Sequence, residues 1–267
     1  MNHLLPVPFR RLIAIAVVVA TGASVAGCSD DTATSTTTVT SVGGSIVVSA
    51  AASLTGTFPA LGKEFETAHP GMTITFNFDS SGTLATQIIS GAPADVFASA
   101  DNATMTKLSD AKLIDGAPVT FAKNQLAIVT KPGNPTHVTA VADLAQQHVV
   151  ALCAETAPCG KYAAQILGKA GVTIPTASIT RGQNAKATLT AVSPGDADAG
   201  VVYVTDAKAA GSKVQVVSIP TDQNAVAIYP IATVSASTNK ALARAFVQFV
   251  NSPDAQRELR AAGFLSP

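Results

Sequence analysis

The sequence predicts an α/β fold with two lobes, and three observations support this prediction. Strand-like and helix-like segments alternate along the chain from about residue 45, which is typical of a mainly parallel sheet flanked by helices. Two long extended runs, near Asn124 and Tyr229, divide this part of the chain into three. The segment from Ser45 to Pro267 is also long enough for two lobes of about 100 residues each.

The extended runs also define the expected partition of the chain. If both runs cross between the lobes, residues 45–123 plus 229–267 form lobe I and residues 124–228 form lobe II. Each lobe is then a mixed, mainly parallel sheet, and the crossing strands act as a hinge. Ligands of open α/β sheets bind at the carboxyl ends of the strands, so we expect a ligand in the cleft between the lobes.

Residues 1–27 are expected to be a signal peptide, because Arg10 and Arg11 precede the apolar run "LIAIAVVVATGASVA". This run is shorter than the roughly 20 residues that a membrane-spanning helix needs. The ending "VAGC" resembles a bacterial lipobox, which implies a lipid anchor on Cys28 at the outer face of the cell membrane. An ordinary signal followed by a free thiol is the alternative. Residues 28–44 are rich in Thr and Ser and are expected to be a disordered tether.

In lobe I, β-branched runs indicate the strands, and breaking signals such as "HPG" indicate where a helix stops. The order is strand, helix, strand, helix, strand, which is the βαβ pattern of a parallel sheet. The expected strands are Ile46–Val48, Met72–Phe78 and Val96–Ala98, and the expected helices are Leu54–Ala68 and Thr83–Ser90.

The rest of the chain continues the alternation of strands and helices. The expected strands are 124–130, 148–153, 178–180, 199–205, 213–219 and the long run 225–234. The expected helices are 141–146, 161–169, 185–192, 239–250 and 254–262.

The charge of the chain argues against nucleic acid as a partner. The chain has 17 basic and 17 acidic residues, only 13% charged residues in total, 5% aromatic residues and no Trp. There is no basic stripe, so nucleic-acid binding is unsupported. For the same reason, an anionic ligand would not be captured by a cationic surface.

The chain contains three cysteines, Cys28, Cys153 and Cys159. Lipidation of Cys28 leaves an even pair, close in sequence, in an exported protein, which favours a disulfide over two free thiols. A zinc site needs about four ligands, and His69, His137 and His148 do not group around the pair in the sequence.

Several strand–helix junctions supply hydroxyls and backbone N–H groups but hardly any charge. The first turn of a helix has unpaired N–H donors and a partial positive charge, so several such ends in one cleft would bind an anion without a cation. For any single junction, an ordinary N-cap is the simpler explanation. The junctions contain Ser53, Ser80–Gly82, Cys159–Gly160, Ala185 and Tyr203.

The segments "AAASL", "SSGTLATQIISGAPADVFASAD", "PCGKYA" and "GVVYVTDA" resemble the periplasmic molybdate-binding proteins of ABC importers. The resemblance extends from about Ile46 to Phe264. It implies a two-lobed periplasmic-binding-protein fold of type II, with molybdate or tungstate bound in the cleft between the lobes. It also implies a membrane permease as partner, no cofactor and no enzymatic activity, and we expect a monomer.

The family holds its oxyanion by two serine hydroxyls, backbone N–H groups and a tyrosine hydroxyl. The resemblance places these roles on the side chains of Ser53, Ser81 and Tyr203 and on the backbone of Cys159 and Ala185.

The sequence departs from the family pattern in three places. Cys159 stands where the family has a small residue, but only its N–H is needed. "QNAKA" replaces a more typical acidic-apolar-basic run around Ala185. Asp79 stands where a small or neutral residue is commoner, and a carboxylate in the cleft would repel a dianion or accept the proton of hydrogen phosphate. We expect Asp79 to point away along the strand.

Other functions have weaker support from the residues. "SDAK" and "STNK" fit a bare S-x-x-K pattern, but the companion motifs of that hydrolase class are missing, as is G-x-S-x-G. An amino-acid site needs a carboxylate and an arginine, and the five positions include neither. An iron site needs tyrosine and histidine ligands, and the chain has only three tyrosines, which argues against such a cluster. A sulfate- or phosphate-binding lipoprotein of the same fold and a lipid-anchored adhesin are the remaining alternatives.

Overall fold

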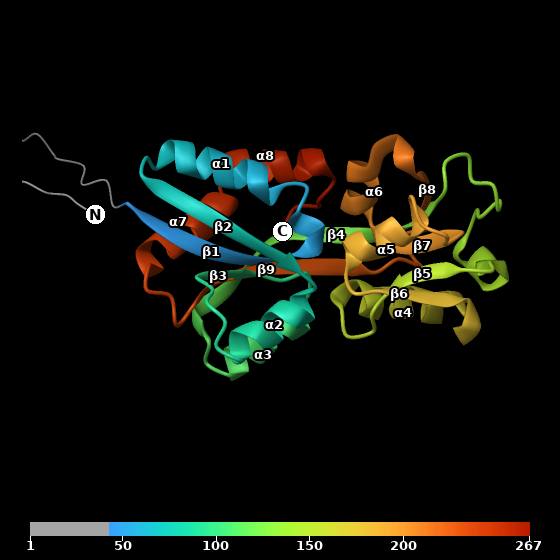
Figure 1. Cartoon of the computed structure of the whole chain (residues 1–267), viewed down its shortest axis with the longest axis horizontal. Helices are drawn as coiled ribbons and strands as arrows, with labels where there is room; N and C mark the ends of the chain where they lie inside the picture. Colours follow the sequence, from blue (N-terminus) through green and yellow to red (C-terminus); the bar gives the residue numbers. More distant parts are fainter. Residues whose placement is uncertain (1–42) are drawn as a thin grey trace, which may run out of the picture. The chain divides into compact units, whose positions relative to one another are not determined.

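The computed structural model describes residues 43–267 (Figure 1). Its first strand, β1 (Gly44–Ala51), is an interior strand of the sheet. The predicted signal peptide and Cys28 lie outside the described residues. Both faces of β1 are covered from Val48 onward, since Val48 and Ala50 are fully buried on one face and Ser49 and Ala51 are each 2% exposed on the other. Such an apolar run is typical of a central parallel strand.

The nine strands form one sheet with the order β2-β1-β3-β9-β4-β7-β5-β6, and β8 pairs with β4. We call β2, β1, β3, β9 and the first part of β4 the first section, and the last part of β4 with β7, β5, β6 and β8 the second section. In the first section, β2 (Met72–Asp79) and β3 (Val96–Ala98) run parallel to β1. In the second, β5 (Val150–Cys153) runs parallel to β6 (Ile179–Gly182) and β7 (Ala199–Tyr203).

Two antiparallel strands connect the sections. β4 (Ile114–Thr130) pairs with β9 (Val226–Val234) from Ile114 to Gln125, and then pairs with β7 and with β8 (Gln215–Ser218) from Leu126 to Thr130. The predicted crossings near Asn124 and Tyr229 lie on these strands. Residues 43–267 belong to one compact unit, so the division at 123/124 and 228/229 stays a prediction.

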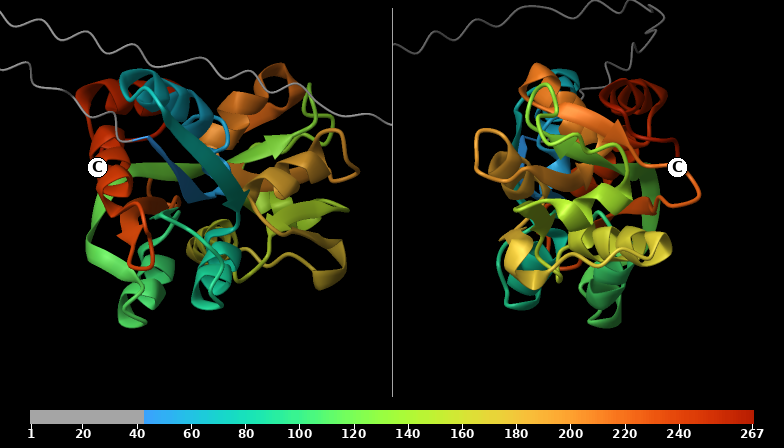
Figure 2. Two further views of the ribbon diagram at one scale, coloured as in Figure 1. Left: turned by 60° about the vertical axis from the view of Figure 1, so that its left-hand side comes forward. Right: turned by 90° about the vertical axis from the view of Figure 1, so that its right-hand side faces the viewer.

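Helices cover both faces of each section, as the views in Figures 1 and 2 show. In the first section, α1 (Phe58–Ala68), α7 (Lys240–Val250) and α8 (Pro253–Ala262) pack on one face, and α2 (Ser81–Ile89) and α3 (Asn102–Asp110) pack on the other. In the second section, α4 (Pro158–Ala170) covers one face, and α5 (Ala185–Val192) and α6 (Val204–Ala210) cover the other. The mixed, mainly parallel α/β architecture predicted from the sequence is confirmed.

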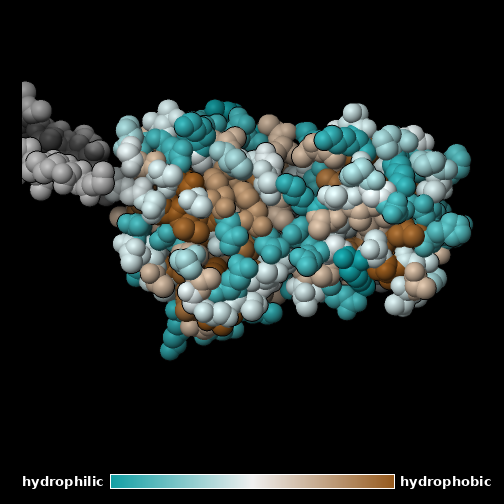
Figure 3. Space-filling model, in the orientation of Figure 1, coloured by the Kyte–Doolittle hydropathy of each residue, from teal (hydrophilic) through white to brown (hydrophobic). Residues whose placement is uncertain are grey.

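The apolar spacing explains how the covering helices pack. Phe58, Leu61 and Phe65 recur at helical spacing along α1 and are fully buried, and Phe65 meets Phe246 of α7 edge to face at 5.4 Å. Figure 3 shows one face of the molecule, where exposed apolar residues lie among hydrophilic ones on both sections.

Some elements differ from the prediction. A short 3-10 helix, η1 (Ala52–Leu54), follows β1, and α1 begins at Phe58 rather than Leu54, because Pro59 is favoured in a first helical turn. β4 begins at Ile114, ten residues before the predicted strand. Helices α3 and α6 were not predicted. The remaining 3-10 helices are η2 (Val141–Gln146), where a helix was predicted, η3 (Thr176–Ser178) and η4 (Gly211–Lys213).

Candidate functional site

A small cavity lies where the two sections meet, at the ends of β1 and β7 and at the N termini of α2, α4 and α5. Its volume, counted as space open to the centre of a water molecule, is about 10 Å³, which is room for about one water. All five residues predicted for the site line it. The lining residues are Ala51, Ala52, Ser53, Ser80, Ser81, Ala100, Ala157, Pro158, Cys159, Asn184, Ala185 and Tyr203.

Ser53 lies in η1, directly after β1, and is 6% exposed. The sequence predicted it at the start of a helix, but α1 begins five residues later, and Ser53 is not its N-cap. The Ser53 Oγ lies 2.8 Å from the hydroxyl of Tyr229 on β9. The Asn124 side-chain amide donates a longer hydrogen bond, of 3.5 Å, to the same tyrosine hydroxyl.

Ser81 is the first residue of α2 and is buried. Its Oγ accepts a hydrogen bond of 2.9 Å from the backbone N–H of Ala100. A hydroxyl has one proton and two lone pairs, so this bond leaves the Ser81 proton free to be donated. Ser81 is therefore prepared to act as a donor at the cavity wall.

Cys159 and Ala185 supply backbone groups from two helices of the second section. Cys159 is the second residue of α4, and Ala185 is the first residue of α5, whose N-cap is Asn184. The first-turn N–H groups of a helix have no partner within the helix and add a partial positive charge. Both residues border a cavity that favours negative charge for this reason.

The predicted disulfide is confirmed. The sulfur atoms of Cys153 and Cys159 are bonded, and the two Cα atoms lie 5.7 Å apart. Cys153 is the last residue of β5, so the bridge ties the first turn of α4 to the end of a central strand.

Tyr203 ends β7 and is 1% exposed. Its hydroxyl is buried and has no hydrogen-bond partner among the described residues. Burial is the main cause that raises the pKa of Tyr203 well above the usual value, so the hydroxyl keeps its proton. A buried protonated hydroxyl without a partner, on the wall of a cavity, is suited to donate to a ligand there.

No charged side chain lines the cavity. Asp79, the acidic residue nearest in sequence to the predicted donors, is absent from the lining. Its Oδ1 accepts hydrogen bonds from the Ser80 N–H, at 2.6 Å, and from the Asn184 side-chain amide, at 2.9 Å. Asp79 therefore stays out of the cavity, as expected, but it bonds across the two sections, which the sequence did not predict.

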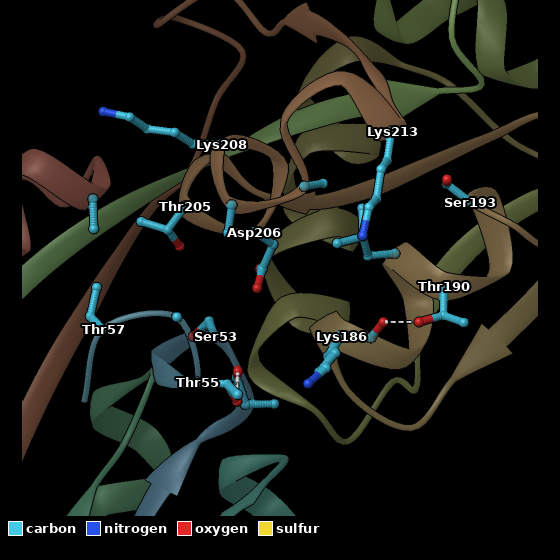
Figure 4. A pocket seen from close by; sticks show the side chains of 16 residues that line it. Ser53, Thr55, Thr57, Lys186, Thr190, Ser193, Thr205, Asp206, Lys208 and Lys213 are labelled. Carbon is cyan, nitrogen blue, oxygen red and sulfur yellow. Dashed lines mark hydrogen bonds between the residues drawn. The ribbon is translucent and has the colours of Figure 1, made fainter. Parts of the chain in front are cut away.

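A larger groove, of about 550 Å³, lies beside the cavity and shares Ala52 and Ser53 with it (Figure 4). Lys186, Lys208 and Lys213 belong to its lining. Figure 4 shows Lys213 and Asp206 reaching into the space between α5 and α6, whereas Lys208 extends away. Burial raises the pKa of Asp206 to about 7, and the N–H of Tyr203 partly opposes this shift.

Several residues that line the cavity or contact Ser53 are not among the five predicted positions. Ser80 is noted only as a hydroxyl at a junction, and Asn184 is missed, although both are N-caps by position, which is a local signal. Tyr229 and Asn124 carry no such signal, because they reach Ser53 only through the crossing of β4 and β9.

Within residues 43–267, no helix is both long and apolar enough to span a membrane, and no three His, Cys, Asp or Glu side chains are grouped as metal ligands.

Known proteins are similar to this chain in sequence and in fold. A putative ABC transporter substrate-binding lipoprotein of Bacillus subtilis, YvgL, is 31% identical over 244 residues, which are 90% of this chain and 92% of YvgL. The molybdate-binding protein ModA of Mycobacterium tuberculosis is 39% identical over 224 residues, 84% of this chain and 85% of ModA. The structure of the Azotobacter vinelandii periplasmic molybdate-binding protein superposes with a TM-score of 0.76 at 24% identity, covering 83% of this chain and 99% of that one.

The family described as bacterial extracellular solute-binding protein matches residues 46–265. This match covers the sheet, the helices around it and the cavity. The chain therefore belongs to the bacterial extracellular solute-binding protein family.

Proposed function

We propose that this protein binds molybdate outside the cytoplasm and delivers it to the permease of an ABC importer. The observation that carries the proposal is the cavity itself. Five separate junctions, distant in sequence, meet there and present neutral hydrogen-bond donors without a charged side chain. Its relatives include proteins named as molybdate-binding, and the sequence similarity to them extends over almost the whole described chain.

The five residues supply two kinds of hydrogen-bond donor in this proposal. The hydroxyls of Ser53, Ser81 and Tyr203 donate to the oxygens of the anion, and the backbone N–H groups of Cys159 and Ala185 donate from two helix N termini. Hydrogen bonds to a charged acceptor are worth about 1.5–3 kcal/mol each. Together with the helix dipoles, they replace the water shell of a dianion without a cation.

The cavity must open to admit such an anion. Room for about one water is too little for a tetrahedral ion with four oxygens. The proposed lobes, 45–123 plus 229–267 and 124–228, would separate by bending at β4 and β9, which is the hinge motion of two-lobed binding proteins. The ligand would then be enclosed from both sides.

Neutral donors at a fixed separation favour molybdate and tungstate over the two rival anions. Sulfate is smaller, so it leaves donors of one section unpaired. Each buried donor without a partner costs about 1–3 kcal/mol of binding free energy. Hydrogen phosphate carries a proton, and no carboxylate lines the cavity to accept it. Asp79 does not change this argument, since its carboxylate is bonded to Ser80 and Asn184 outside the cavity.

Export and anchoring belong to the same proposal. "VAGC" and the tether at residues 28–44 support lipidation of Cys28 and a position on the outer face of the cell membrane. A relative over most of the chain is named a lipoprotein. We expect a monomer that docks on its permease and has no other partner besides the oxyanion and the membrane.

A panel of oxyanions tests the proposal. Molybdate and tungstate should raise the melting temperature of the protein, because a ligand that binds only the folded state stabilises it by mass action. Titration calorimetry should then give tight binding for these two anions and weak or no binding for sulfate and phosphate. Tight phosphate binding or equal sulfate and molybdate affinities would contradict the proposed function.

A further inference from the structure

Each of the two helices that bring backbone N–H groups to the cavity is tied to the first section by one aspartate. Asp79, at the end of β2, contacts the N-cap of α5, and Asp101, the N-cap of α3, contacts the first turn of α4. Neither aspartate lines the cavity. The two contacts join the sections on the elements that carry Ala185 and Cys159.

The contact at α5 uses both ends of one amide. Asn184 Nδ2 donates to Asp79 Oδ1 at 2.9 Å, while Asn184 Oδ1 accepts from the Ala187 N–H at 3.0 Å and so caps α5. The Ser80 N–H donates to the same Asp79 oxygen at 2.6 Å and fixes the carboxylate. The position of the α5 N terminus relative to β2 is therefore set by a chain of directed hydrogen bonds.

The contact at α4 is an ion pair built on a second cap. Asp101 Oδ1 accepts from the Thr104 N–H at 2.8 Å, which caps α3, and Asp101 Oδ2 accepts from Lys161 Nζ at 2.8 Å. The Asp101 side chain is 6% exposed and that of Lys161 is 34% exposed. Partial burial weakens the screening of this pair by solvent and salt.

The sections also approach closely beside these contacts. A Cβ atom at Gly82 of α2 would lie 3.1 Å from the carbonyl oxygen of Thr156, just before α4. The absence of a side chain at Gly82 allows this approach. The separation of the sections at the cavity is thus set by contact as well as by hydrogen bonds.

We propose that Asp79 and Asp101 are positioning residues that limit how far the N termini of α5 and α4 move from Ser53 and Ser81 when an anion is enclosed, and thereby set the size of anion that the site selects. This inference rests on the proposed function. Hydrogen bonds weaken steeply with distance and angle, so a few tenths of an ångström between the sections decide which anion meets every donor. Without the two contacts, the closed form is less populated, and apparent affinity falls in proportion.

Asp79→Ala tests the contact at α5, because it removes the acceptor for Asn184 Nδ2 and adds no charge to the cavity, which Asn184 lines. We expect molybdate affinity to fall at least tenfold and the ratio of molybdate to sulfate affinity to fall with it. The loss of a negative charge near the site would by itself favour an anion, so a lower affinity identifies lost positioning. Asp79→Asn keeps an amide oxygen that accepts from Asn184 and from the Ser80 N–H, and should stay within about threefold of the parent.

Asp101→Asn tests the contact at α4, because Asn retains the α3 cap and loses the charge facing Lys161. The matched control is Asp115→Asn, which breaks the ion pair of Asp115 with Arg244, at 2.7 Å, within the first section. Asp101→Asn should lower molybdate affinity and speed dissociation, and Asp115→Asn should change neither.

Small-angle scattering provides a readout without ligand. The ligand-free Asp79→Ala/Asp101→Asn variant should have a larger radius of gyration than the parent and the Asp115→Asn control. Unchanged affinity, selectivity and radius of gyration in these variants, or a loss in Asp79→Asn as large as that in Asp79→Ala, would overturn the inference. If the parent itself binds no oxyanion, the proposed function fails, and the scattering result alone then decides whether the two contacts hold the sections together.

Discussion

The Ser53 Oγ lies 2.8 Å from the Tyr229 hydroxyl, although 176 residues separate the two in the sequence. Tyr229 in turn accepts a hydrogen bond of 3.5 Å from Asn124 on β4, and Asn124 also donates to Thr205 at 2.9 Å. Either hydroxyl can donate in the contact between Ser53 and Tyr229, and when Tyr229 donates, the Ser53 proton is free for the cavity. The two crossing strands thus supply the hydrogen-bond partner of the serine at the site.

Ser53→Ala should reduce molybdate affinity by roughly ten- to a hundredfold, because it removes one donor to a charged acceptor. Tyr229→Phe should cause a smaller loss, since the serine stays but loses the partner that orients it. Titration calorimetry measures both. If Ser53→Ala binds molybdate as tightly as the parent, the serine is not a donor to the anion.

Tyr203→Phe should separate binding from stability. The Tyr203 hydroxyl is buried without a partner among the described residues, so its removal should leave the melting temperature of the ligand-free protein unchanged or raise it. Molybdate affinity should fall by roughly ten- to a hundredfold. A clear loss of stability in the ligand-free variant would mean that the hydroxyl serves the fold instead.

The disulfide should matter more for binding than for folding. Cys153 and Cys159 are six residues apart, and closing so short a loop stabilises the fold by only about 2 kcal/mol. The Cys153→Ser/Cys159→Ser variant should therefore still fold but bind molybdate less tightly, because the first turn of α4 is no longer tied to β5. Chemical unfolding curves would measure the stability of this variant, and titration calorimetry would measure its molybdate affinity. Unchanged affinity would contradict the prediction.

Asp206 should make stability depend on pH. Its pKa is raised from 3.8 to about 7 in the folded protein, so the folded state binds the proton more tightly than the unfolded state. The unfolding free energy should accordingly fall as the pH rises from about 4 to 7, by on the order of 1–3 kcal/mol from this group. Asp206→Asn removes this titration but keeps an acceptor for the Tyr203 N–H.

Chemical unfolding at pH 5 and pH 8 tests this prediction. Relative to the parent, Asp206→Asn should gain more stability at pH 8 than at pH 5. The exposed Asp254 offers a matched control, since Asp254→Asn should follow the parent at both values. Parallel pH profiles of Asp206→Asn and the parent would be inconsistent with a raised pKa.

The lysines of the neighbouring groove should affect the rate at which molybdate is captured, although the charge of the whole chain predicts no cationic surface. Lys186 and Lys213 border a groove that shares Ser53 with the cavity, and they concentrate positive charge in a protein with no net charge. Lys186→Gln/Lys213→Gln should slow molybdate association roughly two- to tenfold at low salt and leave dissociation unchanged. Stopped-flow binding at two salt concentrations measures this, with Lys107→Gln on the exposed side of α3 as control. Equal association rates would exclude steering by this groove.

The sequence by itself determined the α/β class and the order of most elements, and the resemblance of its segments to a known family pointed to the five cavity residues. The patterns behind the class and the order are local. The alternation of strand and helix patterns, the polar residues at helix starts and the spacing of Cys153 and Cys159 are all visible within short windows of the chain. Helix α3 escaped prediction because Met105 and Leu108 are its only large apolar residues, and helix α6 did so because a strand-like "YVT" run leads into it.

The tertiary structure decided how these residues are used. The sequence could not show that Tyr229 bonds to Ser53, or that Asp79 turns out of the cavity towards Asn184. Hydrogen bonds act over about 3 Å, so their partners are chosen by which strands and helices become neighbours, and not by separation along the chain. At this cavity, the crossing of β4 and β9 and the meeting of α4 and α5 with the first section make that choice.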